Sequence, residues 1–384
     1  MNHSWNIRRL GDICTSELGK TRDEKRNKGT FRPYLCAINV QWDRFDLSEL
    51  KEMRFEDDEY DRYTIRKGDL VICEGGDIGR AAIWDNEQPI YYQNALHRVR
   101  FVKGIDARFI LYYFMYLKQT GILDGRYGKG VTIKHLVKST LVSIPVPVPP
   151  IVEQQRIVSE LDLLTGIIDK KNAQLRDLDA LAQSIFYEMF GDPITNEKGW
   201  PVRFLEEIAS SQIGLTYKPE NVSETGTIVL RSSNIQNSII DLNEIVRVNC
   251  DIKEKQFVRE GDILMCSRNG SFRLVGKVAK IQNLPERMSY GAFMTTIRSD
   301  YNDYLFGFFK TPAFRAQLGL AKTATINQIT VKMLNAIQLP VPPKDIQSSF
   351  AERIAHITSQ QNAIIESLKG IQHLFNSRMS LYFG

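Results

Sequence analysis

The strongest constraint on the fold is an internal repeat that divides this chain of 384 residues into two similar halves. The segment Pro147-Val148-Pro149-Pro150 recurs 193 residues later as Pro340-Val341-Pro342-Pro343. The same offset relates Gly68-Asp69 to Gly261-Asp262. Nearer the start of each copy the offset becomes 195, and Asn39-x-Gln41 then matches Asn234-x-Gln236. A match that keeps its register over this distance predicts two copies of one structural unit.

Each copy ends with a segment that is typical of a long helix. No proline occurs between Pro150 and Pro193, and apolar residues recur every three or four positions, which indicates a coiled-coil seam. The seam positions are Ile157, Leu161, Leu164, Ile168, Leu175, Leu178, Ala182, Ile185 and Met189 in the first copy, and Phe350, Ile354, Ile357, Ile364, Leu368, Ile371, Phe375 and Tyr382 in the second. We expect the two helices to pack against each other as an antiparallel coiled coil. The alternative is a coiled coil that joins two chains.

The segments ahead of the helices indicate a mixed α/β fold. Short β-rich runs at 63–65, 69–73 and 81–84 recur at 257–259, 262–266 and 276–281, with glycine-rich turns between them. A more helical stretch follows at 109–117 and at 304–309. The predicted organisation is a globular segment at 1–150, a helix at 151–190, a second globular segment at 191–343 and a second helix at 344–384.

The net charge of +5 points only weakly to an anionic partner, but the charges are unevenly distributed. Residues 98–140 carry nine Lys or Arg and two acids, whereas residues 41–61 carry nine acids and three bases. The basic stretch either attracts phosphate or forms a solvated surface. The tract 19–28 has five bases in ten residues and is either a flexible loop or a phosphate contact.

The sequence lacks the motifs of several enzyme and metal-binding classes. It contains no Asn/Asp-Pro-Pro-aromatic tetrapeptide of an adenine methyltransferase, no Gly-x-Gly-x-x-Gly and no phosphate-binding Gly-x4-Gly-Lys-Ser/Thr. It also contains no His-Glu-x-x-His and no Cys-x-x-Cys pair. We therefore expect no catalytic residue, metal or cofactor. No apolar run is long enough for a membrane span and no signal core occurs at the start, so a cytoplasmic location is expected.

The chain resembles a known family, the specificity (S) subunits of type I restriction–modification enzymes. The segments that are similar to the central conserved region of that family are Ile144-Pro145-Val146-Pro147-Val148-Pro149-Pro150, Glu153-Gln154-Gln155-Arg156-Ile157-Val158 and Phe190-Gly191-Asp192-Pro193. The segment Leu339-Pro340-Val341-Pro342-Pro343 resembles the distal conserved region. Lys67-Gly68-Asp69-Leu70 and Glu260-Gly261-Asp262-Ile263 look like parts of the target recognition domains.

The resemblance implies a non-catalytic subunit that reads a bipartite site on double-stranded DNA. Each target recognition domain would read a few base pairs, and the helix pair would set the distance between them. Two modification (methyltransferase) subunits, which bind S-adenosylmethionine, would dock on the helical region, and a restriction subunit could join them. Two other readings stay open: a single-chain DNA methyltransferase or nuclease, and a structural coiled-coil scaffold with unrelated end domains.

Residue type and position beside glycine-rich turns select the candidate DNA contacts. Arginine pairs with guanine and asparagine or glutamine with adenine at base edges, while lysine can hold phosphate. In the first copy the candidates are Arg80, Gln93, Asn94 and Lys129. In the second copy they are Arg231, Asn234, Arg268 and Lys322.

Overall fold

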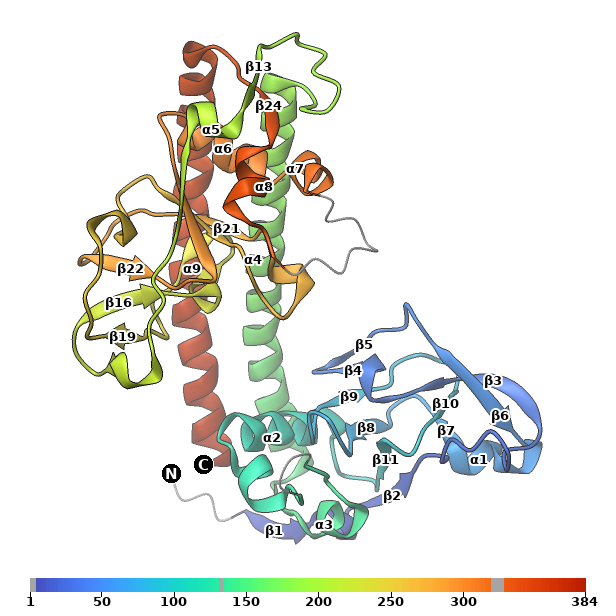
Figure 1. The fold of residues 1–384 in the computed structure, drawn as a ribbon. Coiled ribbons are helices and arrows are strands. Elements are labelled where there is room, and N and C mark those ends of the chain that lie inside the picture. The colour runs from blue at the N-terminus through green and yellow to red at the C-terminus, as the bar shows by residue number, and fades with distance from the viewer. Residues whose placement is uncertain (1–4, 131–133, 319–327) are drawn as a thin grey trace. The chain divides into compact units, whose positions relative to one another are not determined.

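The computed structural model describes residues 5–130, 134–318 and 328–384 (Figure 1). The chain forms two compact units, Met1–Lys170 with Leu368–Gly384, and Lys171–Ser367. Two long helices, α4 (Ile151–Phe190) and α9 (Lys344–Phe383), are each divided between the two units, so that one part of each helix belongs to the first unit and the other part to the second. Among the described residues, no helix is both long enough and apolar enough to cross a bilayer.

The globular part of the first unit holds two four-stranded sheets, a hairpin and a two-stranded ribbon. One sheet is antiparallel, in the order β2-β11-β8-β9, and the other has the order β6-β3-β10-β7, in which β3 and β10 are parallel. The strands are β1 Asn6–Arg9, β2 Cys14–Leu18, β3 Thr30–Leu35, β4 Val40–Gln41, β5 Arg44–Phe45, β6 Lys51–Phe55, β7 Thr64–Ile65, β8 Leu70–Cys73, β9 Ala81–Ile83, β10 Ile90–Tyr92, β11 Leu96–Phe101 and β12 Pro145–Val148. The ribbon joins β1 to β12, so the first and last strands of this globular part are hydrogen-bonded neighbours.

Apolar burial explains how these strands are held on a helix. All four side chains of β8 are buried, as expected for a strand in the interior of a covered sheet. Helix α2 (Ala107–Gln119) is capped at its N-terminus by Asp106, whose carboxylate accepts a hydrogen bond from the backbone nitrogen of Arg108 at 2.8 Å. Phe109 and Phe114 of α2 share one core with β8 and with the first turns of α4. This core fixes the loops at the ends of the strands.

The second unit repeats this plan. Its sheets have the orders β14-β23-β20-β21 and β15-β19-β16-β22, and β16 and β22 are parallel, as β3 and β10 are. The elements are β13 Val202–Phe204, α5 Leu205–Ile208, β14 Ser210–Ile213, β15 Val222–Ser223, β16 Thr227–Leu230, β17 Ile235–Gln236, β18 Ile239–Ile240, β19 Arg247–Val248, β20 Ile263–Cys266, β21 Val278–Lys280, β22 Met288–Tyr290, β23 Met294–Arg298, α6 Asn302–Phe309, α7 Pro312–Gln317, α8 Val331–Asn335 and β24 Gln338–Pro340. The strand expected at 257–259 is reduced to a single bridge between Phe257 and Ser289, because only that residue pairs with β22.

A buried ion pair recurs in the same place in both units. Asp69 is 2% exposed, and its carboxylate accepts two hydrogen bonds from Arg100, both at 2.7 Å. In the second unit Asp262 is 1% exposed and pairs in the same way with Arg298, at 2.8 and 2.6 Å. Each aspartate also accepts the backbone N–H three residues earlier, so it closes the turn before the central strand. The Gly-Asp match in the sequence therefore marks a structural pair.

In each unit a part of α4 packs on a part of α9. In the first unit the Tyr382 hydroxyl donates to Glu160 at 2.5 Å, and Ile157, Leu161 and Leu164 share a core with Met379. All three of those predicted seam residues are buried.

The seam of the second unit agrees with the prediction only in part. Leu175 of α4 is buried as predicted, but near the end of the helix Phe186 and Phe190 are buried, whereas Ile185 and Met189 are only partly buried. The reason is an aromatic cluster, in which both phenylalanines pack against Tyr304 and against Phe350 of α9.

Candidate nucleic-acid interface

Three loops of the first unit, those that follow β3, β8 and β10, meet at one edge of its sheets. The backbone nitrogen of Gln93 donates to Leu35 at 2.9 Å, and that of Glu74 donates to Ala95 at 2.9 Å. A further backbone bond runs from Leu136 to Glu74 at 2.7 Å and brings in the segment after α2. These bonds gather residues from four distant parts of the chain at one surface.

The four candidates of the first unit lie at this edge but differ in their freedom to bind. Lys129 is exposed, in a backbone bridge with His135. Gln93 and Asn94 form the half-buried turn between β10 and β11, and Asn94 donates from its side chain to the Thr21 hydroxyl at 3.3 Å.

Arg80 is the least available of the four. Only 20% of its side chain is exposed, and its guanidinium donates to the carbonyl of Ala37 at 2.8 Å. This bond ties the β8–β9 loop to the loop after β3.

A buried histidine is hydrogen-bonded to the segment after α2 at the same edge. His97 on β11 is completely buried, and its Nε2 lies 2.7 Å from the carbonyl of Leu136, to which it donates. Its Nδ1 is buried without a partner. Burial lowers the pKa of His97 to about 4, because the charged imidazolium is poorly solvated there.

We expect acid to destabilise the first unit through His97. In the unfolded chain the imidazole of His97 takes up a proton near pH 6.5, whereas in the folded chain it does so only near pH 4. The free energy of unfolding is therefore highest above pH 6.5 and falls as the pH drops toward 4. The loss approaches about 3 kcal/mol at the end of this window. Urea unfolding at intervals from pH 7.5 to 4.5 measures it. His97→Gln should show a flatter profile; equal slopes for variant and wild type would contradict the assignment.

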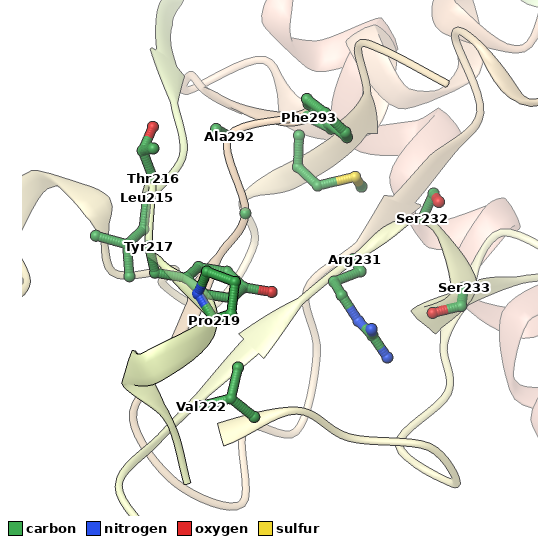
Figure 2. Close-up of a pocket in the computed structure, with 12 residues that line it drawn as sticks. Leu215, Thr216, Tyr217, Pro219, Val222, Arg231, Ser232, Ser233, Ala292 and Phe293 are labelled. Carbon is green, nitrogen blue, oxygen red and sulfur yellow. The ribbon is translucent and has the colours of Figure 1, made fainter. Parts of the chain in front are cut away.

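The corresponding edge of the second unit is hollowed by a pocket of about 620 Å³ (Figure 2). It is lined by Leu215, Thr216, Tyr217, Pro219, Val222, Arg231, Ser232, Ser233, Gly291, Ala292, Phe293 and Met294. Arg231 follows β16 and is half-buried in this lining, and its Nε is buried without a hydrogen-bond partner. Within the described part of the chain, its guanidinium forms no ion pair.

Arg268 stands beside this pocket and is exposed. Its guanidinium carbon lies 5.3 Å from the centre of the Phe293 ring, which is a cation–π distance. The neighbouring Asn269 side chain donates to the Ser232 hydroxyl at 3.0 Å, so the loop after β20 is tied to the loop after β16. Arg231 and Arg268 are therefore brought to one surface.

The expectation that Asn234 contacts a base does not fit its geometry. Asn234 is 2% exposed, and its side chain accepts from the nitrogen of Arg231 at 2.9 Å and donates to the carbonyls of Asp241 and Glu244 at 2.9 and 2.8 Å. Asn39 makes the same three kinds of bond in the first unit. Asn234 therefore holds a loop. Lys322 lies outside the described residues.

The sequence interpretation missed two residues at this edge. Phe293 lies in the turn between β22 and β23 and lines the pocket; it corresponds to Ala95, the residue after Gln93 and Asn94 in the turn of the first unit. The carbonyl of Lys277 accepts a hydrogen bond from the backbone nitrogen of Cys266, as the carbonyl of Arg80 does from Cys73, and burial lowers the pKa of the Lys277 ammonium. The repeat could have located both residues if the turns had been aligned.

The basic stretch at 98–140 turns out to serve the fold for the most part. Arg98 donates to three backbone carbonyls, and Arg108 bridges Asp43 and Asp162. Lys20 of the tract 19–28 is likewise buried, in an ion pair with Glu59. Internal pairing of this kind leaves few cations of the stretch 98–140 for phosphate, whereas the other four bases of the tract 19–28 are exposed.

Comparison with known proteins identifies the repeat. The family model described as the type I restriction modification DNA specificity domain matches the chain twice, at residues 2–177 and 197–372. The chain belongs to this family. The family match confirms the resemblance found in the sequence, and it shows that the two globular parts with their helices are two copies of one specificity domain.

Curated type I specificity subunits are similar to this chain. The EcoKI specificity subunit of Escherichia coli is 29% identical over 172 residues, which are 42% of this chain and 37% of that protein. The StySPI subunit of Salmonella potsdam is 28% identical, with 46% of this chain and 40% of that protein covered. These two matches span less than half of each relative. The EcoBI subunit of Escherichia coli is 21% identical over 84% of this chain and 74% of its own length.

Solved structures share the fold. A type I S subunit from M. genitalium has a TM-score of 0.51 at 13% identity and covers 98% of this chain and 96% of its own. A chain from a type I restriction–modification complex has a TM-score of 0.50 at 18% identity, with 99% and 97% covered. At these identities the likeness establishes the mixed α/β fold of the specificity family and nothing about individual contacts.

Proposed function

We propose that this chain is the non-catalytic, DNA-reading subunit of a type I restriction–modification enzyme and that it reads a bipartite site. The observation that carries the proposal is the duplicated edge, at which the loops after equivalent strands converge in both units. In the first unit Gln93, Asn94 and Lys129 are the proposed contacts, with Arg80 positioning the loops. In the second unit they are Arg231 and Arg268, and Lys322 stays a proposal from its residue type.

We further propose that α4 and α9 form an antiparallel coiled coil that separates the two readers. Supporting contacts occur in both units: the start of α4 meets the end of α9 through Glu160 and Tyr382, and the end of α4 meets the start of α9 through Phe190 and Phe350. A helix of 40 residues at 1.5 Å per residue is about 60 Å long. Two modification subunits, which supply S-adenosylmethionine chemistry, dock on this helical region, and a restriction subunit can join.

The test is the methylation pattern that the chain directs. Cells that express it with its modification subunit are expected to carry methylated adenine in one motif with two specific parts and an unread spacer, as mapped by modification-sensitive sequencing. Expression of the modification subunit alone is the control. Methylation by this chain without a modification subunit would identify a single-chain methyltransferase, and absence of any sequence-selective binding by the complex would contradict the proposal.

A further inference from the structure

Phe293 is an exposed aromatic side chain that the fold of the second unit does not require. It is 57% exposed, whereas its neighbour Met294 is buried at 1%. The turn is held by its backbone, because the carbonyl of Phe293 accepts hydrogen bonds from Ser267 at 2.9 Å and Arg268 at 3.0 Å. The ring can therefore be removed without loss of the bonds that shape this loop.

The ring is paired with the free guanidinium of Arg268. The two lie 5.3 Å apart, and Arg268 makes no ion pair within the described part of the chain. A guanidinium that stacks on an aromatic face keeps its N–H groups in the plane, free to donate outward. Paired in-plane donors match O6 and N7 of guanine in the major groove, and an apolar side chain matches the methyl group of thymine.

The first unit cannot present this pair. The backbone bond from Glu74 to Ala95 corresponds to the bond from Ser267 to Phe293, which places Ala95 where Phe293 stands. The bridge between Gly75 and His135 corresponds to the bridge between Arg268 and Gln328, which places Gly75 where Arg268 stands. The same scaffold thus carries an alanine and a glycine in one unit and an aromatic–cation pair in the other.

We propose that Arg268 and Phe293 form one reading element of the second unit, in which Arg268 binds a guanine and Phe293 contacts the methyl group of a thymine on the adjacent base pair. This inference rests on the proposed DNA-reading function. Adjacency follows from the separation of 5.3 Å between cation and ring, which is larger than the base-pair rise of about 3.4 Å but smaller than two such steps.

The test uses the complex with its modification subunits and duplexes that carry the mapped target. Each thymine of the half-site read by the second unit is replaced by deoxyuridine, one at a time, and each guanine by 7-deazaguanine, which lacks N7. The affinity of the wild-type complex should fall about fourfold when one particular thymine is replaced, because that is the contribution of one buried methyl-sized group. Phe293→Ala should bind the unmodified target more weakly and show no further loss with deoxyuridine there.

Arg268 has its own arm in the same experiment. Arg268→Ala should lose about 5- to 150-fold in affinity and become insensitive to 7-deazaguanine at a position next to that thymine. Ile245→Ala is the matched control, because Ile245 is an apolar residue of the same unit, 40% exposed, outside the pocket lining. Thermal melting of each variant shows whether it is folded, and Phe293→Leu provides a conservative second variant that should retain part of the deoxyuridine response.

The outcomes separate this inference from the function on which it rests. If the complex binds one sequence selectively but Phe293→Ala and wild type respond alike to deoxyuridine at every thymine, the reading element is wrong and the function stands. The same conclusion follows if the second half-site has no guanine beside a thymine. If the wild-type complex shows no sequence preference, the proposed function itself fails.

Discussion

Replacement of Asp69 by alanine is expected to lower the free energy of unfolding of the first unit by about 3 kcal/mol. Asp69 is 2% exposed and holds both Arg100 and the backbone nitrogen of Arg66. Loss of one partner of a buried pair costs about 3–5 kcal/mol, because the other charge is left behind. The lower end applies because the Arg100 side chain is 39% exposed, so water can solvate the freed guanidinium.

Urea denaturation of the full chain measures this effect, and the repeat supplies an internal comparison. Asp262→Ala should destabilise the second unit to a similar extent, because Asp262 is equally buried and Arg298 is 32% exposed. Asp61→Ala is the matched control: Asp61 pairs with Arg66 but is 86% exposed, so its loss should cost less than about 1 kcal/mol. A stability for Asp69→Ala that matches that of Asp61→Ala would show that the buried pair does not close the turn.

A second large effect is expected from Gly19→Ala. A Cβ atom on Gly19 would lie 2.3 Å from the carbonyl oxygen of Gln93 and 2.6 Å from that of Tyr92, both of them backbone atoms. Backbone hydrogen bonds also join the two segments: the nitrogen of Lys20 donates to the carbonyl of Tyr92, and the nitrogen of Asn94 donates to the carbonyl of Lys20. We expect the free energy of unfolding to fall by about 3 kcal/mol, which is the upper part of the range for overpacking. We also expect a weaker affinity for DNA, because the Gln93–Asn94 turn must move.

Gly166→Ala is the control for this substitution and should raise the free energy of unfolding. Gly166 lies within α4, and a Cβ there would meet nothing within 4 Å. Alanine should therefore stabilise the helix by about 0.5–1 kcal/mol. Differential scanning calorimetry distinguishes the two directions, and a binding assay with target DNA follows the turn. An unchanged melting temperature for Gly19→Ala would mean that the two loops are not in close contact.

The helices could be predicted from sequence because their signals are local. Pro149-Pro150 precedes α4 and Gly191 ends it in the left-handed region at φ = 76°, and the helix occupies Ile151–Phe190 between them. The sheets could not be predicted in the same way. The pairing of β11 with β2 joins residues about 80 positions apart, and no local pattern specifies such a partner.

Sequence alone could not distinguish the polar residues that hold the loops of the candidate site from those that are exposed there, and the two asparagines show why. Asn39 and Asn234 match between the copies because both copies need the same buried loop anchor. A residue shared by both units serves the scaffold that they share. Readers of different sequences are expected where the copies diverge, as Gly75 and Arg268 do, and there residue type alone gives no guide to exposure.

The ribbons β1–β12 and β13–β24 have a consequence for how such a chain can change over evolutionary time. Each ribbon pairs the opening strand of a globular part with its closing strand, Asn6–Arg9 with Pro145–Val148 and Val202–Phe204 with Gln338–Pro340. A module whose two attachment points are adjacent can be substituted whole while its support stays intact. Genetic recombination at these ribbons can therefore combine two globular parts of different origin on one unchanged pair of helices, and under the proposed function such an exchange creates a new target.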